Sequence, residues 1–167
     1  SVTIYSKDGN SKKTVRVKVA EGTIRTTTKG NVKGTKSSDA ASLIWYGIPY
    51  GASTGGTNRW KAPQPVSAWS GTWNARIPKS GAACYGDGTN YQGTEDCLYV
   101  NIYRPNTTEK NLPVMVYLHG GGNASGTANT DFSKFAVAAK AVVVSVEYRL
   151  GAFGYLSHPA LQTGTAE

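Results

Sequence analysis

The sequence of 167 residues predicts an α/β domain in which antiparallel strands come first and the start of a parallel sheet follows. Two nearly continuous apolar strands, Leu112–Leu118 and Ala141–Val146, lie on either side of a segment, 132–140, that has a helical pattern. Asp131 is a suitable N-cap for this helix. A strand–helix–strand unit makes its two strands parallel, and apolar strands of this kind are typical of a sheet buried on both faces.

The segments before this unit predict antiparallel strands. β-Branched residues alternate with polar ones over 2–6, 13–20 and 22–28, and Glu21-Gly22 predicts a turn between the last two. Residues 29–40 are polar and predict a loop. We therefore expect two or three short antiparallel strands near the N-terminus.

The middle of the chain predicts a long loop between two further strands. Ser42–Tyr50 and Leu98–Tyr103 have the composition of strands, whereas Gly51–Asp96 is rich in Gly, Pro, Ser and Asn and has no helical period. A loop of this length is usually functional or disordered. Its three tryptophans favour a packed, ordered loop: Trp60, Trp69 and Trp73.

The net charge of +8 is concentrated at the N-terminus, where residues 1–36 hold nine basic and two acidic residues. Basic side chains on the solvent face of strands explain this pattern, and a polyanion-binding module is the alternative. Nucleic-acid surfaces usually interleave stacking aromatic residues with their charges, but Tyr5 is the only aromatic residue before Trp45. We therefore expect no nucleic-acid partner. No strictly apolar run is longer than the five residues of Val114–Leu118, which is too short to span a membrane.

The two cysteines, Cys84 and Cys97, do not have the spacing of a zinc site, and the chain has only two histidines to complete one. We expect neither a metal ion nor a cofactor. The 13 steps between the cysteines leave two alternatives open, a disulfide and two buried thiols.

The strongest chemical motif is His119-Gly120-Gly121-Gly122, which directly follows an apolar strand. Consecutive glycines let the backbone approach a ligand closely with its N–H groups free, so that they can bind a phosphate or a developing oxyanion. No Gly-Lys-Ser/Thr follows, and the spacing is not GxGxxG, so that neither of the common nucleotide-binding loops fits. The pattern is typical of the oxyanion loop of esterases and lipases, and the alternative is a flexible turn.

Several segments together resemble the type-B carboxylesterases, a family that also contains the cholinesterases. The segment Glu95–Pro105, EDCLYVNIYRP, is similar to the signature of this family. Other matching segments follow the family's order: Gly47–Tyr50, Arg59-Trp60, Pro63, Pro65, Trp69, Leu112–Val116, Tyr148–Gly151 and Phe153–Leu156. The resemblance covers residues 20–160.

This resemblance implies an α/β-hydrolase fold, of which the chain is the N-terminal portion. The nucleophile of the family lies in a Gly-Glu-Ser-Ala-Gly segment downstream of Tyr-Arg-Leu-Gly, and the acid and the histidine of the triad lie further on. None of these segments is found in residues 1–167. We therefore expect 1–167 to be the N-terminal segment of a single domain that a missing or separate C-terminal chain completes.

The resemblance also implies roles for particular residues. Gly121 and Gly122 would donate the hydrogen bonds of the oxyanion hole. Cys84 and Cys97 would form a disulfide, and Glu95 would form a salt bridge with Arg149. We expect His119 to position the loop and His158 to lie in a surface loop.

Two apparent functional features are discounted. Gly51-Ala52-Ser53-Thr54-Gly55 matches GxSxG, but the sequence that follows, Arg59–Pro63, cannot open the helix that a nucleophile elbow requires. The cholinesterases place a choline-stacking tryptophan between the two matching cysteines, whereas this chain has only Tyr85 and Tyr91 there. We therefore do not expect a quaternary-ammonium substrate.

The expected function is hydrolysis of a small carboxylic ester through a Ser–His–acid triad and an acyl-enzyme. The alternative is a catalytically inactive family member that serves as an adhesion or binding domain. A disulfide would indicate a secreted protein, or a periplasmic one in a bacterium. Asn106-Thr107-Thr108 is an N-glycosylation sequon, which matters only in a eukaryotic secretory host. Because 162–167 is small and polar, we expect proteolytic cleavage after Glu167 to leave a docked second polypeptide.

Overall fold

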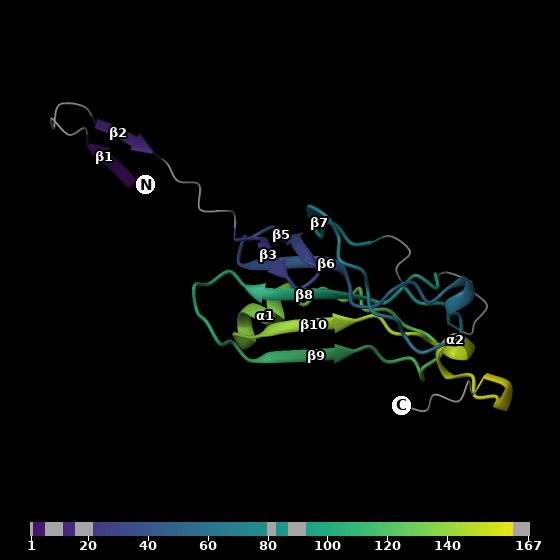
Figure 1. The fold of residues 1–167 in the computed structure, drawn as a ribbon. Coiled ribbons are helices and arrows are strands. Elements are labelled where there is room, and N and C mark those ends of the chain that lie inside the picture. Colours follow the sequence, from purple (N-terminus) through teal and green to yellow (C-terminus); the bar gives the residue numbers. More distant parts are fainter. Residues whose placement is uncertain (1, 6–11, 16–21, 80–82, 87–92, 162–167) are drawn as a thin grey trace.

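The computed structural model of the protein describes residues 2–5, 12–15, 22–79, 83–86 and 93–161. Its first element is an antiparallel hairpin of strands β1 (Val2–Tyr5) and β2 (Lys12–Val15), which begins near the N-terminus as the sequence predicts (Figure 1). The rest of the predicted strand over 13–20, from residue 16 on, lies outside the described residues, as does the cleavage site predicted after Glu167.

A small sheet follows, with the strand order β3-β4-β7. Its strands are β3 (Ile24–Thr27), β4 (Gly30–Lys33) and β7 (Thr72–Asn74), of which β3 and β4 are antiparallel and β4 and β7 parallel. The prediction of a loop over 29–40 is wrong for β4 and for the short strand β5 (Thr35–Lys36). Pairing with neighbouring strands decides the conformation of such polar segments, because intrinsic strand preference is weak.

The larger sheet has the strand order β5-β6-β8-β10-β9. The strands β6 (Ser42–Pro49), β8 (Tyr99–Pro105), β9 (Val114–Leu118) and β10 (Val142–Val146) agree with the predicted strands to within two residues at each end. All neighbours are antiparallel except β9 and β10, which are the parallel pair that the sequence predicts. In Figure 1 the arrows of β9 and β10 point the same way, toward α2.

Helix α1 (Ser133–Ala139) connects β9 to β10, so that the predicted strand–helix–strand unit is confirmed. The Asp131 carboxylate accepts a hydrogen bond of 2.8 Å from the Ser133 amide, although Phe132 holds the N-cap position. A second short helix, α2 (Gly151–Tyr155), was not predicted. Two 3₁₀ turns, η1 (Gly56–Asn58) and η2 (Pro159–Leu161), complete the described elements.

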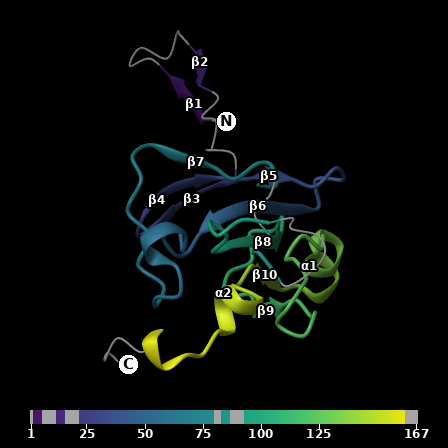
Figure 2. The ribbon, with the colours of Figure 1, turned by 90° about the vertical axis from the view of Figure 1, so that its right-hand side faces the viewer.

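In Figure 2, strand β6 lies between the small sheet of β3, β4 and β7 and helix α1, and apolar side chains pack on both faces of β6. On one face, Leu43 and Trp45 pack with Val32 of the small sheet. On the other, Ile44 packs with Tyr103 and with Ala136 of α1. The alternation of side chains along one strand therefore joins the small sheet to one face of the larger sheet and α1 to the other.

The long segment between β6 and β8 is ordered where it is described, as the sequence predicts. The indole N–H of Trp69 donates to the Asn31 carbonyl at 2.8 Å, and that of Trp73 donates to the Gly47 carbonyl at 3.0 Å. Both rings pack against the core next to Val32 and Trp45. Trp60 differs, because it is 43% exposed, and its indole N–H donates to the Ala152 carbonyl at 3.1 Å. Two tryptophans therefore tie this segment to both sheets.

Strand β9 departs from the prediction of burial on both faces. Val114, Val116 and Leu118 are 64%, 60% and 64% exposed, because β9 is the edge strand of its sheet. Strand β10, which lies inside the sheet, keeps Val143 and Ser145 fully buried. An apolar edge of this kind is a strong site for pairing or association.

Burial of Tyr103 predicts a loss of stability in alkali. Its hydroxyl donates to the Thr130 carbonyl at 3.0 Å, and burial raises the pKa of Tyr103 well above its usual range. Above about pH 10 the unfolded chain loses this proton and the folded chain keeps it, so that the free energy of unfolding falls as the pH rises. Tyr103→Phe should lose about 1 kcal/mol at neutral pH and show a shallower alkaline fall, measured by urea unfolding.

Tyr155→Phe is the matched control, because the Tyr155 ring is 54% exposed. Its unfolding curves should follow those of the unchanged protein at every pH. Equal alkaline slopes for Tyr103→Phe and the unchanged protein would contradict the role given to Tyr103.

Candidate functional site

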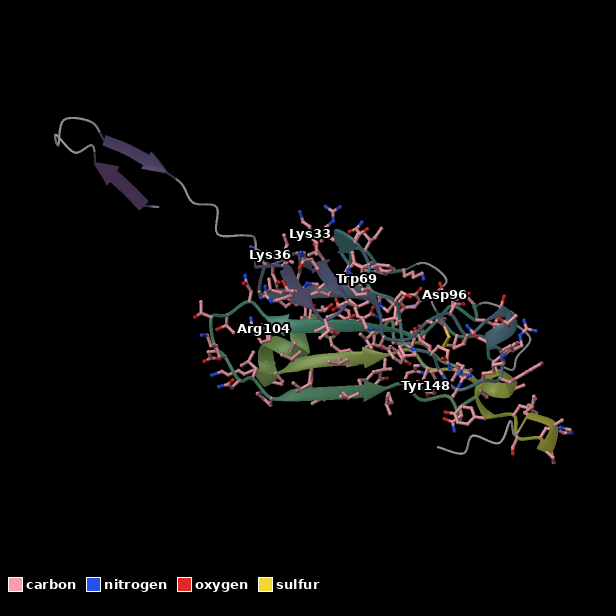
Figure 3. The ribbon with its side chains drawn as sticks, in the orientation of Figure 1. Lys33, Lys36, Trp69, Asp96, Arg104 and Tyr148 are labelled. Carbon is pink, nitrogen blue, oxygen red and sulfur yellow. A yellow bond between two sulfur atoms is a disulfide. The ribbon has the colours of Figure 1, made fainter. Side chains whose placement is uncertain are left out.

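The site lies at the edge of the larger sheet where the parallel strands β9 and β10 end. Leu118 is paired with Val146 in register, so that the next residues, His119 and Glu147, leave the sheet side by side. Figure 3 shows Tyr148 at this end, beyond the arrowhead of β10. Loops at the carboxyl ends of parallel strands are where α/β proteins usually place their functional groups.

The glycine motif forms a tight turn that only glycine can make. The Gly121 carbonyl accepts hydrogen bonds from the amides of Ala124 and Ser125, at 3.0 and 3.1 Å. Gly121 has φ +125°, and a Cβ there would overlap the Ser125 carbonyl. Gly122 has φ +61°, with open space where a Cβ would lie. Internal hydrogen bonds and close packing hold this loop, which favours a fixed turn over a flexible one.

Two backbone N–H groups of the loop make no hydrogen bond with any described residue. Within the described part of the chain, the amides of Gly121 and Gly122 donate to no backbone or side-chain acceptor. An open hollow of about 470 Å³ lies beside Gly122, with the α2 residues Gly151 and Tyr155 in its wall. The Gly151 amide donates to the Asn123 carbonyl at 2.7 Å and so fixes α2 against the loop. The hollow is large enough for a small ligand group next to two unused donors.

A buried pair of ionisable residues lies directly beneath the loop. The side chains of His119 and Glu147 are each 3% exposed, and the His119 Nε2 lies 3.6 Å from the Glu147 Oε2. Neither of these two atoms has a hydrogen-bond partner among the described residues. The imidazole also stacks on Tyr148, with the ring centres 4.4 Å apart, and the Tyr148 hydroxyl donates to the His119 carbonyl at 2.6 Å.

Sequence reasoning missed Glu147. A signal was present, because a single acidic residue follows the apolar strand β10 at the level where His119 follows β9. A charged residue so close to a buried strand end requires a partner. Only the parallel register of the two strands shows that this partner is His119.

The structure joins Cys84 to Cys97 in a disulfide, with the Cα atoms 5.0 Å apart, as the family resemblance implies. Both cysteines are buried with Leu98 and Leu150. The bridge lies next to the glycine loop, because a Cβ on Gly86 would overlap the Ala124 carbonyl. The disulfide therefore holds the segment from Cys84 to Gly86, which packs against Ala124 of the loop.

The predicted salt bridge between Glu95 and Arg149 is wrong. Glu95 pairs with Arg59, whose Nε donates to Oε2 at 2.7 Å while Nη2 contacts Oε1. Arg149 donates instead to the Lys61 carbonyl at 2.9 Å. The hydrogen bond to Arg59 lowers the pKa of Glu95, and the hydrogen bond to Glu95 raises that of Arg59.

The physical reason is the path of the segment that contains Arg59. The 3₁₀ turn η1 precedes Arg59, and Thr54 anchors the same segment through a hydroxyl bond of 2.6 Å to the Glu95 carbonyl. Arg59 is thereby held beside Glu95. The resemblance implied Arg149 as the partner, whereas the path of this segment places Arg59 beside Glu95.

The remaining candidates lie away from the glycine loop. Ser53 is exposed in a loop before η1, without the strand-to-helix turn of a nucleophile elbow. His158 is exposed and accepts a hydrogen bond of 3.1 Å from the Ala160 amide. Asn106 is exposed, and its side-chain amide donates to the Ala40 carbonyl at 2.9 Å. Among the described residues, no group of three or more His, Cys, Asp or Glu side chains could hold a metal ion.

Basic residues gather where the two sheets meet: Lys33 lies in β4 of the small sheet and Lys36 in β5 of the larger one, and both are labelled in Figure 3. Together with Arg76 they line an open hollow of about 450 Å³. Burial and the charge of Arg104 lower the pKa of the neighbouring Arg25. Polyanion binding stays the alternative interpretation of these basic residues.

Replacing both cysteines tests how much the disulfide contributes. The double variant Cys84→Ser/Cys97→Ser should lose about 3 kcal/mol of unfolding free energy, because the bridge restricts the unfolded chain. Urea unfolding with and without a reductant measures this difference. The reductant should destabilise the unchanged protein by a similar amount and leave the double variant unaffected, and equal stability of the two proteins without reductant would contradict the prediction.

Comparison with known proteins finds similarity to the carboxylesterase family. The model of the carboxylesterase family matches residues 20–164. Over 142 residues the chain is 40% identical to the para-nitrobenzyl esterase of Bacillus subtilis, and over 147 residues it is 37% identical to the fumonisin B1 esterase of Sphingopyxis macrogoltabida. These alignments cover 80% and 83% of this chain but only 29% and 26% of the two relatives.

Solved structures agree with the sequence relatives. A structure of para-nitrobenzyl esterase superimposes with a TM-score of 0.74 at 38% identity, over 82% of this chain and 29% of that chain. A carboxylesterase of Geobacillus stearothermophilus superimposes with a TM-score of 0.69 at 31% identity, over 80% of this chain and 28% of that chain. The chain therefore spans less than a third of the length of these relatives.

Proposed function

Because the chain belongs to the carboxylesterase family and has the N-terminal portion of the α/β-hydrolase fold, we propose that it is the oxyanion-binding part of an enzyme that hydrolyses small carboxylic esters. In such an enzyme a serine attacks the ester carbonyl, a histidine transfers protons and an acid orients the histidine. Backbone N–H groups stabilise the oxyanion that forms in both halves of the acyl-enzyme reaction. Residues 1–167 supply this last contribution.

The observation that carries the proposal is the pair of unused amides at Gly121 and Gly122. They lie on a loop fixed by internal hydrogen bonds, next to an open hollow. Donors that are already in place cost no reorganisation when charge develops on the carbonyl oxygen. A flexible glycine turn would have to reorganise at each turnover, and this reorganisation would raise the barrier.

We assign the nucleophile to a downstream segment that pairs with β9. β9 is the edge strand of its sheet, which leaves room for a further strand beside it, and the exposed side chains of Val114, Val116 and Leu118 supply an apolar surface that this segment would help to cover. A further strand parallel to β9 would end at the same edge of the sheet as the glycine loop, and a serine in the turn after it would face Gly121. The relatives, of which this chain covers less than a third, have the length for such a segment.

The proposal includes an oxidising compartment outside the cytoplasm. The bridge between Cys84 and Cys97 supports it, because disulfides persist mainly in secreted and periplasmic proteins. None of the described helices has the length and apolar character needed to cross a membrane.

Labelling with a fluorophosphonate tests the proposed function, because this reagent reacts covalently with an activated serine. The full-length gene product should be labelled and should hydrolyse a short-chain p-nitrophenyl ester. Residues 1–167 expressed alone should be neither labelled nor active, because the nucleophile is assigned downstream. A folded full-length product that is not labelled would contradict the esterase proposal and favour the inactive binding domain, and labelling of 1–167 alone would contradict the placement of the nucleophile.

A substitution in the loop tests the oxyanion assignment. In the full-length product, Gly121→Ala should lower kcat by about 100-fold or more, because the added Cβ overlaps the Ser125 carbonyl and displaces the donors. Gly120→Ala is the matched control, because a Cβ there meets nothing within 4 Å. Hydrolysis of the p-nitrophenyl ester measures both variants, and equal effects at the two positions would contradict the assignment.

A further inference from the structure

We propose that Glu147 is the positioning residue of the oxyanion loop, and that its carboxylate holds the loop at both ends. The inference rests on the proposed function for its catalytic consequence only. Its structural content concerns residues 119–128 and stands without any assumption about the reaction.

The first end of the loop is held through His119. The Glu147 Oε2 faces the His119 Nε2 at 3.6 Å, and both atoms are buried without another partner among the described residues. Glu147 is placed for this contact because its own amide donates to the Tyr99 carbonyl at 2.9 Å and its carbonyl accepts the Tyr50 hydroxyl at 2.7 Å. The backbone that carries the carboxylate is therefore fixed from two sides.

The second end of the loop is held through the other carboxylate oxygen. The Glu147 Oε1 accepts hydrogen bonds from the Thr127 hydroxyl at 2.7 Å and from the Ala128 amide at 2.8 Å. One carboxylate therefore contacts the residue that opens the loop and the two residues that close it. Hydrogen bonds to a charged acceptor are stronger than neutral ones, so that these two bonds hold residues 127 and 128 firmly in place.

The donors and acceptors around the pair require one proton between His119 and Glu147. The Thr127 and Ala128 groups both donate to Oε1. The His119 Nδ1 lies 3.0 Å from the Gly120 carbonyl, an acceptor, so that Nδ1 carries a hydrogen. Two lone pairs would face each other at Nε2 and Oε2 unless one of these atoms were protonated, and burial makes that arrangement costly.

Few other ionisable groups lie against the pair. Tyr148 stacks on the imidazole, and Tyr50 donates to the Glu147 carbonyl. Burial raises the pKa of both tyrosines, so that neither is charged near neutral pH. Arg149 lies near Tyr50 and directs its guanidinium to the Lys61 carbonyl.

Two variants of Glu147 separate positioning from simple packing. Glu147→Ala removes the carboxylate contacts that hold both ends of the loop. Glu147→Gln keeps a carbonyl oxygen for Thr127 and Ala128 and offers an N–H to the His119 Nε2, so that it should restore the loop. Glu109→Ala is the control, because Glu109 is an exposed acidic residue away from the loop.

Hydrogen exchange of the full-length gene product, followed by mass spectrometry on peptides covering 119–128, gives the first readout. Glu147→Ala should speed exchange in this segment by about tenfold or more and leave peptides from β6 unchanged. Glu147→Gln and Glu109→Ala should exchange as the unchanged protein does. Exchange in Glu147→Ala within about twofold of the unchanged protein would overturn the proposal, as would equal acceleration in Glu147→Gln at about pH 8.

Ester hydrolysis gives the second readout. Glu147→Ala should lower kcat by about 100-fold with KM changed less than about threefold, because displaced oxyanion donors affect the transition state more than substrate binding. Glu147→Gln should stay within about tenfold of the unchanged kcat at about pH 8. A rise in KM with kcat unchanged in Glu147→Ala would overturn the catalytic part.

Thr127→Val provides a second test, which can be made even if Glu147→Ala does not fold. It removes one hydrogen bond to Oε1 and leaves the His119 contact intact. Exchange in 119–128 should rise by about threefold or more, and unchanged exchange would overturn the closure at this end. A full-length product without esterase activity would contradict the proposed function alone, since the exchange measurements would still decide whether Glu147 positions the loop.

Discussion

The parallel pairing of β9 with β10 is the constraint on which the site depends. Five residues of each strand are in register, from Val114 with Val142 to Leu118 with Val146. This register brings His119 and Glu147 to the same edge of the sheet, although they are far apart in the sequence. A slip of one residue would turn the side chains of one strand to the opposite face and separate the pair. The position of the glycine loop therefore follows from backbone pairing inside the sheet.

Close packing then gives the loop a single shape. Gly121 lies against the Ser125 carbonyl, and Gly126 lies against the His119 ring and the Gly120 carbonyl, with no room for a Cβ at either position. From outside, the segment of the Cys84–Cys97 disulfide packs against Ala124 through Gly86. Glycines that would make an isolated turn flexible thus make this one rigid, because their lack of side chains lets neighbouring segments approach it closely.

The charged pairs near the site differ in what they contribute. Arg59 and Glu95 lie at the surface, with side chains 41% and 15% exposed, and solvent screening makes such pairs weak. His119 and Glu147 are buried, where an unpaired charge is far more costly. A resemblance to a family identifies which charged residues are present, but burial and the path of the backbone decide which of them meet and how much they matter.

The sequence by itself determined the strand–helix–strand unit, the glycine loop after β9, the disulfide partners through the family resemblance, and the family itself. These are local or strongly patterned features: apolar runs, consecutive glycines and a signature segment. Only the tertiary structure decided that polar residues 30–33 form a strand, that Arg59 pairs with Glu95, and that Glu147 lies beneath the loop. Each of these depends on which segment lies beside which. Strand pairing and burial are long-range contacts, and no local pattern in the chain encodes the identity of a distant partner.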